Sequence, residues 1–132
     1  MPWDEIFVVF LISHLVGDYL LQTEWQALNK HGGLTGTPEM RLALFSHVTI
    51  YTLCFIPAFI WLWHSDGAAV FGLAALIFIP HLVQDDGRLL ASYSRAVKKA
   101  DLAVNPGLAA AVDQSFHLLA LFLTALLASG GA

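Results

Sequence analysis

Apolar residues fill four stretches of the chain, each about 20 residues long, and polar segments separate one stretch from the next. A helix of that length crosses the hydrocarbon core of a bilayer. The pattern therefore predicts an all-α protein: an integral membrane four-helix bundle that forms a single transmembrane domain over residues 1–132. We expect the spans at residues 4–25, 41–63, 68–87 and 107–128.

Glycine and proline mark where these helices bend and end. The first helix is expected to continue through residues 26–31 and to stop at residues 32–33, where two glycines make a left-handed cap easy. The Thr-Pro step at residues 37–38 predicts the start of the second helix. Pro57 predicts a kink in that helix, because proline removes a backbone hydrogen bond. The tight turn at residues 64–67 makes the second and third spans antiparallel neighbours.

Residues 87–104, between the third and fourth spans, alternate apolar and basic positions at near-helical spacing. We expect a short interfacial amphipathic helix there. Every Lys and Arg lies either in this segment or between the first two spans, so the positive-inside rule places both segments in the cytoplasm and both termini outside. The basic residues are Lys30, Arg41, Arg88, Arg95, Lys98 and Lys99.

Composition agrees with a membrane protein. Hydrophobic residues make up 58% of the chain and charged residues 12%, whereas roughly a quarter of the residues in a soluble domain are charged. The net charge of -4 is concentrated in carboxylates within the spans, so it indicates little about soluble partners, and nucleic acid is not expected as one. Cys54 is the only cysteine, which excludes an internal disulfide and a thiolate-rich metal cluster.

Histidine and aspartate recur inside the apolar stretches with one fixed spacing. Three spans each carry one His and one Asp four residues apart, which places the two side chains one turn apart on the same helix face. The second span carries a single histidine. The seven residues are His14, Asp18, His47, His81, Asp85, Asp113 and His117.

The order of each pair matches the direction of its span. The first and third spans run inward and read His then Asp, whereas the fourth runs outward and reads Asp then His. In all three, therefore, the Asp is nearer the cytoplasm. At 1.5 Å per residue, all seven side chains fall in a slab about 10 Å thick in the inner half of the bilayer. We expect them to meet in one site, with Gly17 beside Asp18 allowing a close helix approach.

Ionised carboxylates at membrane depth are costly without a counter-charge and are functional by default. The spans hold no Lys or Arg for Asp18, Asp85 and Asp113 to pair with. Either the acids stay protonated, or the histidines are charged, or a bound metal balances the site. Imidazole and carboxylate ligands suit Zn, Mn or Fe, and seven ligands are too many for one zinc ion. We therefore expect divalent metal as the cofactor, with two ions in a dinuclear site.

Six polar residues are candidates for contacts around the metal ligands or with a substrate. Two glutamines flank predicted ligands and are expected to orient imidazoles. Asp86 lies 100° from Asp85 around a helix, which favours pairing with Arg88 over metal binding. The six are Gln22, Tyr51, Gln84, Asp86, Arg88 and Gln114.

These motifs resemble a domain-of-unknown-function family of small bacterial polytopic membrane proteins. The likeness covers nearly the whole chain and rests on HLVGDYLLQ at residues 14–22 with Asn29 and Lys30, on the His47 and His81 segments, and on DQSFH at residues 113–117. It implies a membrane-embedded fold in the bacterial cytoplasmic membrane, but no activity. A looser resemblance, in residue types only, is to small membrane-bound metal-dependent hydrolases.

The first hypothesis for function is a metal-dependent membrane hydrolase that acts on a lipid or another amphipathic substrate from the cytoplasmic leaflet. The metal would generate hydroxide at neutral pH, and Asp85, nearest the water interface, would double as ligand and proton acceptor. Basic residues 88–99 would hold anionic headgroups nearby. A di-iron oxidase would use the same ligands.

Two alternatives remain open from the sequence. The His/Asp cluster could be a transient station in a divalent-metal or proton transporter, although the outer halves of the spans are apolar and only a homodimer interface could complete a path. The chain could also be an assembly protein with a structural metal. Retention of metal through chelation separates the enzyme and the structural protein from a transporter, and metal held with no open coordination position favours the structural protein.

Overall fold

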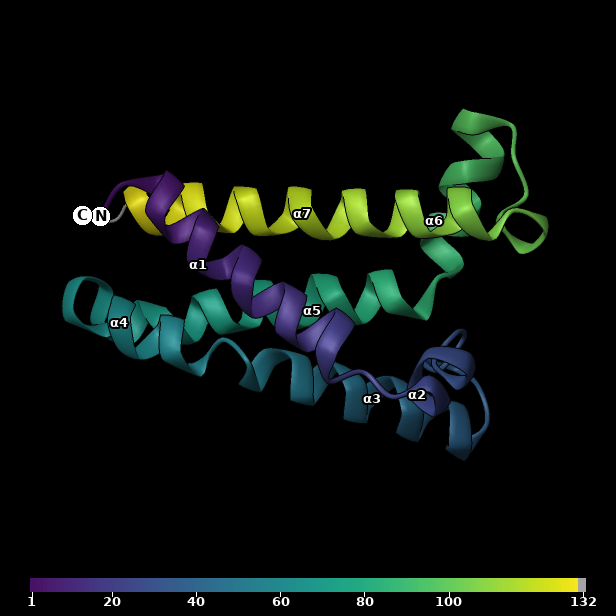
Figure 1. Cartoon of the computed structure of the whole chain (residues 1–132), viewed down its shortest axis with the longest axis horizontal. Coiled ribbons are helices and arrows are strands. Elements are labelled where there is room, and N and C mark those ends of the chain that lie inside the picture. Colours follow the sequence, from purple (N-terminus) through teal and green to yellow (C-terminus); the bar gives the residue numbers. More distant parts are fainter. Residues whose placement is uncertain (131–132) are drawn as a thin grey trace.

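The structure is a computed structural model that describes residues 1–130. Within that range the chain is helical and contains no strand. Figure 1 shows long helices that run side by side, with the chain start and the end of α7 at one end of the molecule. The elements are α1 (Trp3–Leu15), α2 (Glu24–Asn29), α3 (Pro38–Leu53), α4 (Ile56–Asp66), α5 (Val70–Asp86), α6 (Arg88–Tyr93) and α7 (Pro106–Gly130).

The first helix does not continue through residues 26–31, so that prediction is wrong. A π-helical turn, Val16–Leu20, follows α1, and the helix then stops. Thr23 starts α2 as a new helix: its hydroxyl accepts from the Gln26 backbone N–H, and the Gln26 side chain accepts from the Thr23 backbone N–H. A new helix is favoured here over continuation of the first one, because the capping box satisfies backbone N–H donors at the start of α2. The chain therefore turns before residue 24 and brings α2 against α3.

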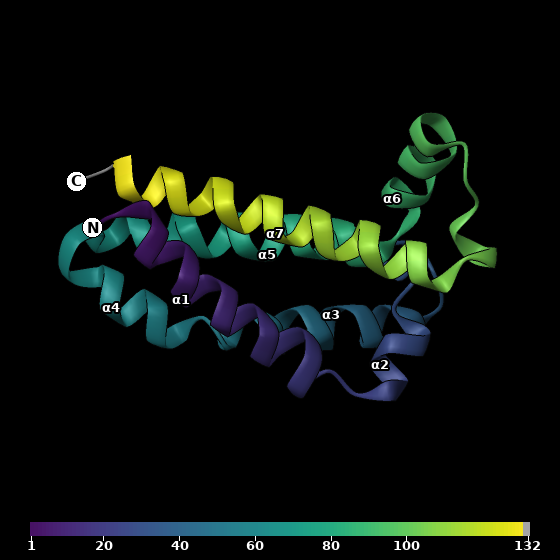
Figure 2. The same cartoon turned by 45° about the horizontal axis from the view of Figure 1, so that its top comes forward.

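The kink predicted at Pro57 is present as a break between two helices. The α3 helix ends at Leu53 and α4 begins at Ile56, with Pro57 in its first turn, where the missing N–H costs nothing. Thr37 caps the start of α3, as its position before Pro38 indicates. The α4 helix then leads through a 3₁₀ turn, Gly67–Ala69, into α5, and the two helices lie antiparallel (Figures 1 and 2).

The segment between α5 and α7 also contains the expected short helix. It comprises α6 and a π-helical continuation, Ser94–Lys98, and ends where Lys99 adopts a left-handed conformation, with φ of 53°. A 3₁₀ turn, Leu102–Val104, connects it to α7. Figure 2 shows this segment at the same end of the molecule as α2, opposite the chain start.

Two helical stretches, residues 56–86 and 106–130, are long and apolar enough to cross a membrane; the first includes the turn at Gly67. The helices contact one another mainly through α1 with α7, α5 with α7, and α3 with α5. Their interior has two parts. Apolar side chains, among them Phe10, Phe55 and Leu62, fill the end near the chain start, and the buried His and Asp residues lie beyond them toward α2 and α6.

Candidate metal centre

The histidines and aspartates that the sequence predicts to meet do converge, and six of the seven are buried. The exception is Asp113, whose side chain is 29% exposed. Gly17 permits the approach of the first helix to α3, because a Cβ at that position would lie 2.7 Å from the Tyr51 ring. The close contact predicted at Gly17 is therefore confirmed. The converging residues come from α1 and its π turn (His14, Asp18), α3 (His47), α5 (His81, Asp85) and α7 (Asp113, His117).

Four ligand atoms form a compact group at the centre. His47 Nε2 lies 3.1 Å from Asp18 Oδ1, 2.9 Å from Asp85 Oδ2 and 3.1 Å from His81 Nε2. His81 Nε2 lies 3.4 Å from Asp18 Oδ1 and 3.1 Å from Asp85 Oδ2. A tetrahedral zinc ion with N and O ligands at 2.0–2.2 Å requires ligand–ligand separations of about 3.3–3.6 Å. Four of the five separations given above are slightly shorter and the fifth, 3.4 Å, lies in this range, so the buried group could hold a metal ion.

The two imidazoles at the centre limit each other's protonation. The Nε2 atoms of His47 and His81 face each other at 3.1 Å, so they cannot both carry a proton without a clash between the two hydrogens. At least one nitrogen therefore directs a lone pair toward the centre of the group, where the neighbouring carboxylate oxygens also accept. Lone pairs gathered at one point are the arrangement that a cation stabilises.

A second group consists of Asp18, Asp113 and His117, whose ligand atoms lie within 4.8 Å of one another. His117 Nδ1 donates to the backbone carbonyl of Asp113 at 2.7 Å, and its Nε2 lies 3.3 Å from Asp85 Oδ1. A hydrogen bond to a backbone carbonyl is how metal-binding imidazoles commonly fix the tautomer that leaves the other nitrogen free. This second group shares Asp18 with the first.

His14 lies beside these groups and belongs to neither. Its Nδ1 bonds the Tyr51 hydroxyl at 3.0 Å, and its Nε2 bonds Gln114 Oε1 at 2.8 Å. Both ring nitrogens are therefore engaged with neutral groups. The Tyr51 ring also stacks on the His81 imidazole, with centroids 3.5 Å apart, and so holds that ring in place. In this arrangement Tyr51 and His14 support the two candidate metal groups from the side of the apolar core.

One premise from the sequence is wrong: the buried acids do have a basic partner. Lys30 is buried, and its Nζ lies 2.9 Å from Asp85 Oδ2 and 2.7 Å from Gln22 Oε1. The sequence predicts Lys30 at the end of the continued first helix, in the cytoplasmic segment between the first two spans and away from the buried acids. The turn before α2 brings the lysine back to the cluster. The Thr23–Gln26 capping pattern was the signal that could have shown this turn.

The other polar residues divide between the cluster and its surroundings. Gln114 bonds both His14 and Asp18, so it does orient an imidazole, whereas Gln84 donates to the Phe116 carbonyl and forms no hydrogen bond with a histidine among the described residues. The expected pairing of Asp86 with Arg88 is confirmed, at 2.7 Å. Asp86 also accepts from the Leu34 backbone N–H and ties the loop after α2 to the end of α5. It lies outside both candidate metal groups.

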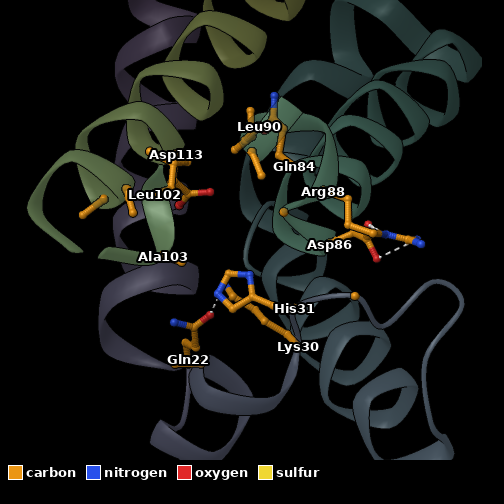
Figure 3. Close-up of a pocket in the computed structure, with 16 residues that line it drawn as sticks. Gln22, Lys30, His31, Gln84, Asp86, Arg88, Leu90, Leu102, Ala103 and Asp113 are labelled. Carbon is orange, nitrogen blue, oxygen red and sulfur yellow. Dashed lines mark hydrogen bonds and ion pairs between the residues drawn. The ribbon is translucent and has the colours of Figure 1, made fainter. Parts of the chain in front are cut away.

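A pocket of about 630 Å³ opens beside the cluster, at the end of the molecule that carries α2 and α6. Figure 3 shows Gln22 and Lys30 on one side of it, Asp86 with Arg88 on another, and Asp113 projecting from α7. Asp113 and Lys30 belong to the lining and also contact the cluster, so they connect the two. Asp85 is 1% exposed and does not line the pocket. The apolar wall is formed by Leu90, Ala91, Leu102, Ala103, Ala109 and Ala110.

Comparison with known proteins identifies the family of this chain but does not indicate an activity. No curated protein and no solved structure matched the chain. One family model matches residues 6–130, which is nearly the entire sequence and includes all seven histidines and aspartates of the cluster. The chain therefore belongs to the family described as "Protein of unknown function (DUF3307)".

Proposed function

We propose that this protein is a membrane-embedded, divalent-metal-dependent hydrolase that acts on a lipid or another amphipathic substrate from the cytoplasmic leaflet. The observation that carries the proposal is the group of two imidazole nitrogens and two carboxylate oxygens, with separations close to those of a tetrahedral metal site. Two N and two O ligands suit Zn, Mn or Fe.

The distribution of side chains supports a four-helix membrane bundle, with α1, α3–α4, α5 and α7 as its spans. Large apolar side chains such as Ile12, Ile60, Phe71 and Leu123 are exposed, while the charged cluster is buried. Soluble monomers rarely expose apolar surface on this scale, whereas a bilayer stabilises it. The α2 and α6 segments at the opposite end from the chain start carry basic residues, which supports an orientation with that end in the cytoplasm and both termini outside.

A metal ion held by the four atoms of the first group would take a water as a fifth ligand and lower the pKa of that water toward ~7. Asp113 is better placed than Asp85 to accept the proton that this water would release. Both oxygens of Asp85 face buried partners, Lys30, His47 and His81 on one side and His117 on the other. Asp113 is partly exposed, lines the pocket and lies 3.5 Å from His117 Nδ1. We therefore assign proton transfer to Asp113 in place of Asp85.

The pocket supplies a route for a substrate from the membrane interface. One wall is apolar and belongs to α6, the Leu102–Val104 turn and α7, while Gln22 and Lys30 present polar groups on one side and Asp86 with Arg88 on another. An amphipathic molecule would lay its apolar part on the first wall and direct its polar group toward Lys30 and Asp113. Exposed basic residues next to α6, including Arg95 and Lys98, would attract anionic lipid headgroups to the entrance.

The apolar core argues against a function as a metal or proton transporter. Between the cluster and the end near the chain start, the described interior is filled by side chains such as Ile6, Phe10 and Leu121. The buried hydroxyls in this part of the structure, Ser13 and Thr124, donate to backbone carbonyls of their own helices, and the described residues offer a cation no buried carboxylate or imidazole along that path. A hydrolase needs access from one side alone, which the pocket provides. A di-iron oxidase would use the same ligands, and the identity of the bound metal separates it from a zinc hydrolase.

The test begins with metal content. Wild-type protein, His81→Ala and the matched control His64→Ala, which removes an exposed histidine outside the cluster, are purified in detergent and analysed for metal per chain. Wild type and His64→Ala should retain metal and His81→Ala should lose it. Metal-loaded wild type is then assayed in lipid nanodiscs against amphiphiles with ester, amide or phosphoester bonds. Equal metal content in all three proteins, or no hydrolysis of any amphiphile by metal-loaded wild type, would refute the proposal.

A further inference from the structure

The Lys30 ammonium touches the same atom that completes the first candidate metal group. Its Nζ lies 2.9 Å from Asp85 Oδ2, and that oxygen lies 2.9 Å from His47 Nε2 and 3.1 Å from His81 Nε2. The lysine side chain is 9% exposed, so water screens little of its charge. A metal ion in the group would therefore share Asp85 with a fixed positive charge.

Local structure holds Lys30 firmly in this position. Its backbone N–H donates to the Gln26 carbonyl at 3.0 Å, and its own carbonyl accepts from Gly33 at 3.1 Å. The Gln26 side chain in turn donates to Ser46 on α3, which docks α2 beside the cluster. Gln22 Oε1 accepts a further hydrogen bond from Nζ at 2.7 Å. These contacts hold the ammonium group in a fixed position within the cluster.

The charges within the cluster favour one divalent ion. Asp18, Asp85 and Asp113 contribute three negative charges, and Lys30 contributes one positive charge. With neutral imidazoles two negative charges remain, which a single divalent ion neutralises, whereas two ions would leave a net positive site in a low-dielectric interior. Buried net charge is strongly disfavoured. Asp86 does not enter this balance because Arg88 neutralises it outside the cluster.

We propose that Lys30 is the fixed second cation of the centre: it limits the cluster to one divalent ion, bound by Asp18, His47, His81 and Asp85, and lowers the affinity for that ion. The inference rests on the metal binding in the proposed function. It replaces the sequence-based expectation of a dinuclear site, in which a second ion would occupy the Asp18, Asp113 and His117 group. Removal of the lysine charge would then favour that second ion.

The test compares wild type with Lys30→Met, Lys30→Gln and Lys30→Arg. Lys98→Met is the matched control, because Lys98 is exposed beyond α6 and contacts none of the cluster. Zinc and manganese per chain are measured by elemental analysis, and affinity is measured by competition with a chromophoric chelator in detergent. Lys30→Gln keeps a donor for Asp85 and so covers the case in which Lys30→Met does not fold. Circular dichroism and thermal unfolding establish the fold of each variant.

Wild type, Lys30→Arg and Lys98→Met should each bind one ion. The neutral variants should bind two ions, or one ion with about tenfold or greater affinity, because they lose a unit charge a few Å from the metal. Two ions in wild type, or neutral variants that bind one ion with the affinity of wild type, would overturn the inference and leave the proposed function standing. Metal absent from wild type would overturn the proposed function. If the neutral variants alone then bound metal, the role of Lys30 as counter-cation would still be supported.

Discussion

His117 and Asp85 face each other through two atoms that both accept hydrogen bonds when the imidazole is neutral. The backbone carbonyl of Asp113, 2.7 Å from His117 Nδ1, requires a proton on that nitrogen. The neutral ring therefore presents the lone pair of Nε2 to Asp85 Oδ1, 3.3 Å away. A proton or a metal ion between the two atoms turns this repulsion into attraction. At the His47–His81 pair, a single proton or a metal ion between the two Nε2 atoms likewise removes the repulsion between their lone pairs.

Chelation should destabilise the protein. A ligand that binds only the folded state adds stability that grows with its concentration, about 2.7 kcal/mol at one hundred times Kd. We expect a lower Tm after treatment with chelator and recovery on addition of zinc or manganese, measured by intrinsic tryptophan fluorescence in detergent. The His81→Ala variant should show neither response. An identical Tm for treated and untreated wild type would argue against a metal held in the folded cluster.

His14→Ala and His47→Ala should differ in metal binding although both residues lie in the cluster. Both nitrogens of His14 bond neutral partners, Tyr51 and Gln114, whereas His47 Nε2 lies among carboxylate oxygens. We expect His14→Ala to retain metal with reduced stability and His47→Ala to lose it. Metal content and Tm of the two variants test this difference. Loss of metal from His14→Ala alone would mean that His14 is a ligand, as the sequence suggests.

Asp113→Asn should separate catalysis from metal binding. Asp113 is the cluster acid that reaches the pocket, and loss of a general base commonly costs 10²–10⁴-fold in rate. We expect kcat to fall by about that factor, while metal bound by Asp18, His47, His81 and Asp85 remains. Asp85→Asn should lose the metal as well as the activity. If Asp113→Asn kept full activity, the proton acceptor would lie elsewhere.

Gly17→Ala should be destabilising, although alanine favours helix. The added Cβ would lie 2.7 Å from Tyr51 Cδ2, and Tyr51 is fixed by its hydrogen bond to His14 and its stacking on His81. Such overpacking costs about 1–3 kcal/mol. Gly72→Ala is the matched control, because nothing lies within 4 Å of a Cβ there, and it should be neutral or stabilising by up to about 1 kcal/mol. Unfolding free energies in mixed micelles test the difference; equal effects would show that the helices can separate at Gly17 without cost.

The sequence by itself determined the helical class and most of the membership of the cluster. Helical periodicity fixes which side chains share a face, so His81 with Asp85 and Asp113 with His117 could be paired from spacing alone. In the fourth span the Asp precedes the His, which is the reverse of the order in the first and third spans. This reversal indicated that the His and Asp residues of all three spans lie at the same depth along the bundle. Proline chemistry likewise predicted the interruption near Pro57, since the missing N–H is a local property of the chain.

Only the tertiary structure decided which of these residues face the centre and what balances their charge. Lys30 reaches Asp85 across 55 residues of sequence, and Gln114 reaches His14 across 100. These contacts depend on the turn before α2 and on how the helices rotate against one another. The burial of Asp85 and the exposure of Asp113 follow from the same packing. Spacing along one helix cannot supply such information, because it fixes the direction of a side chain relative to its own helix and not to the others.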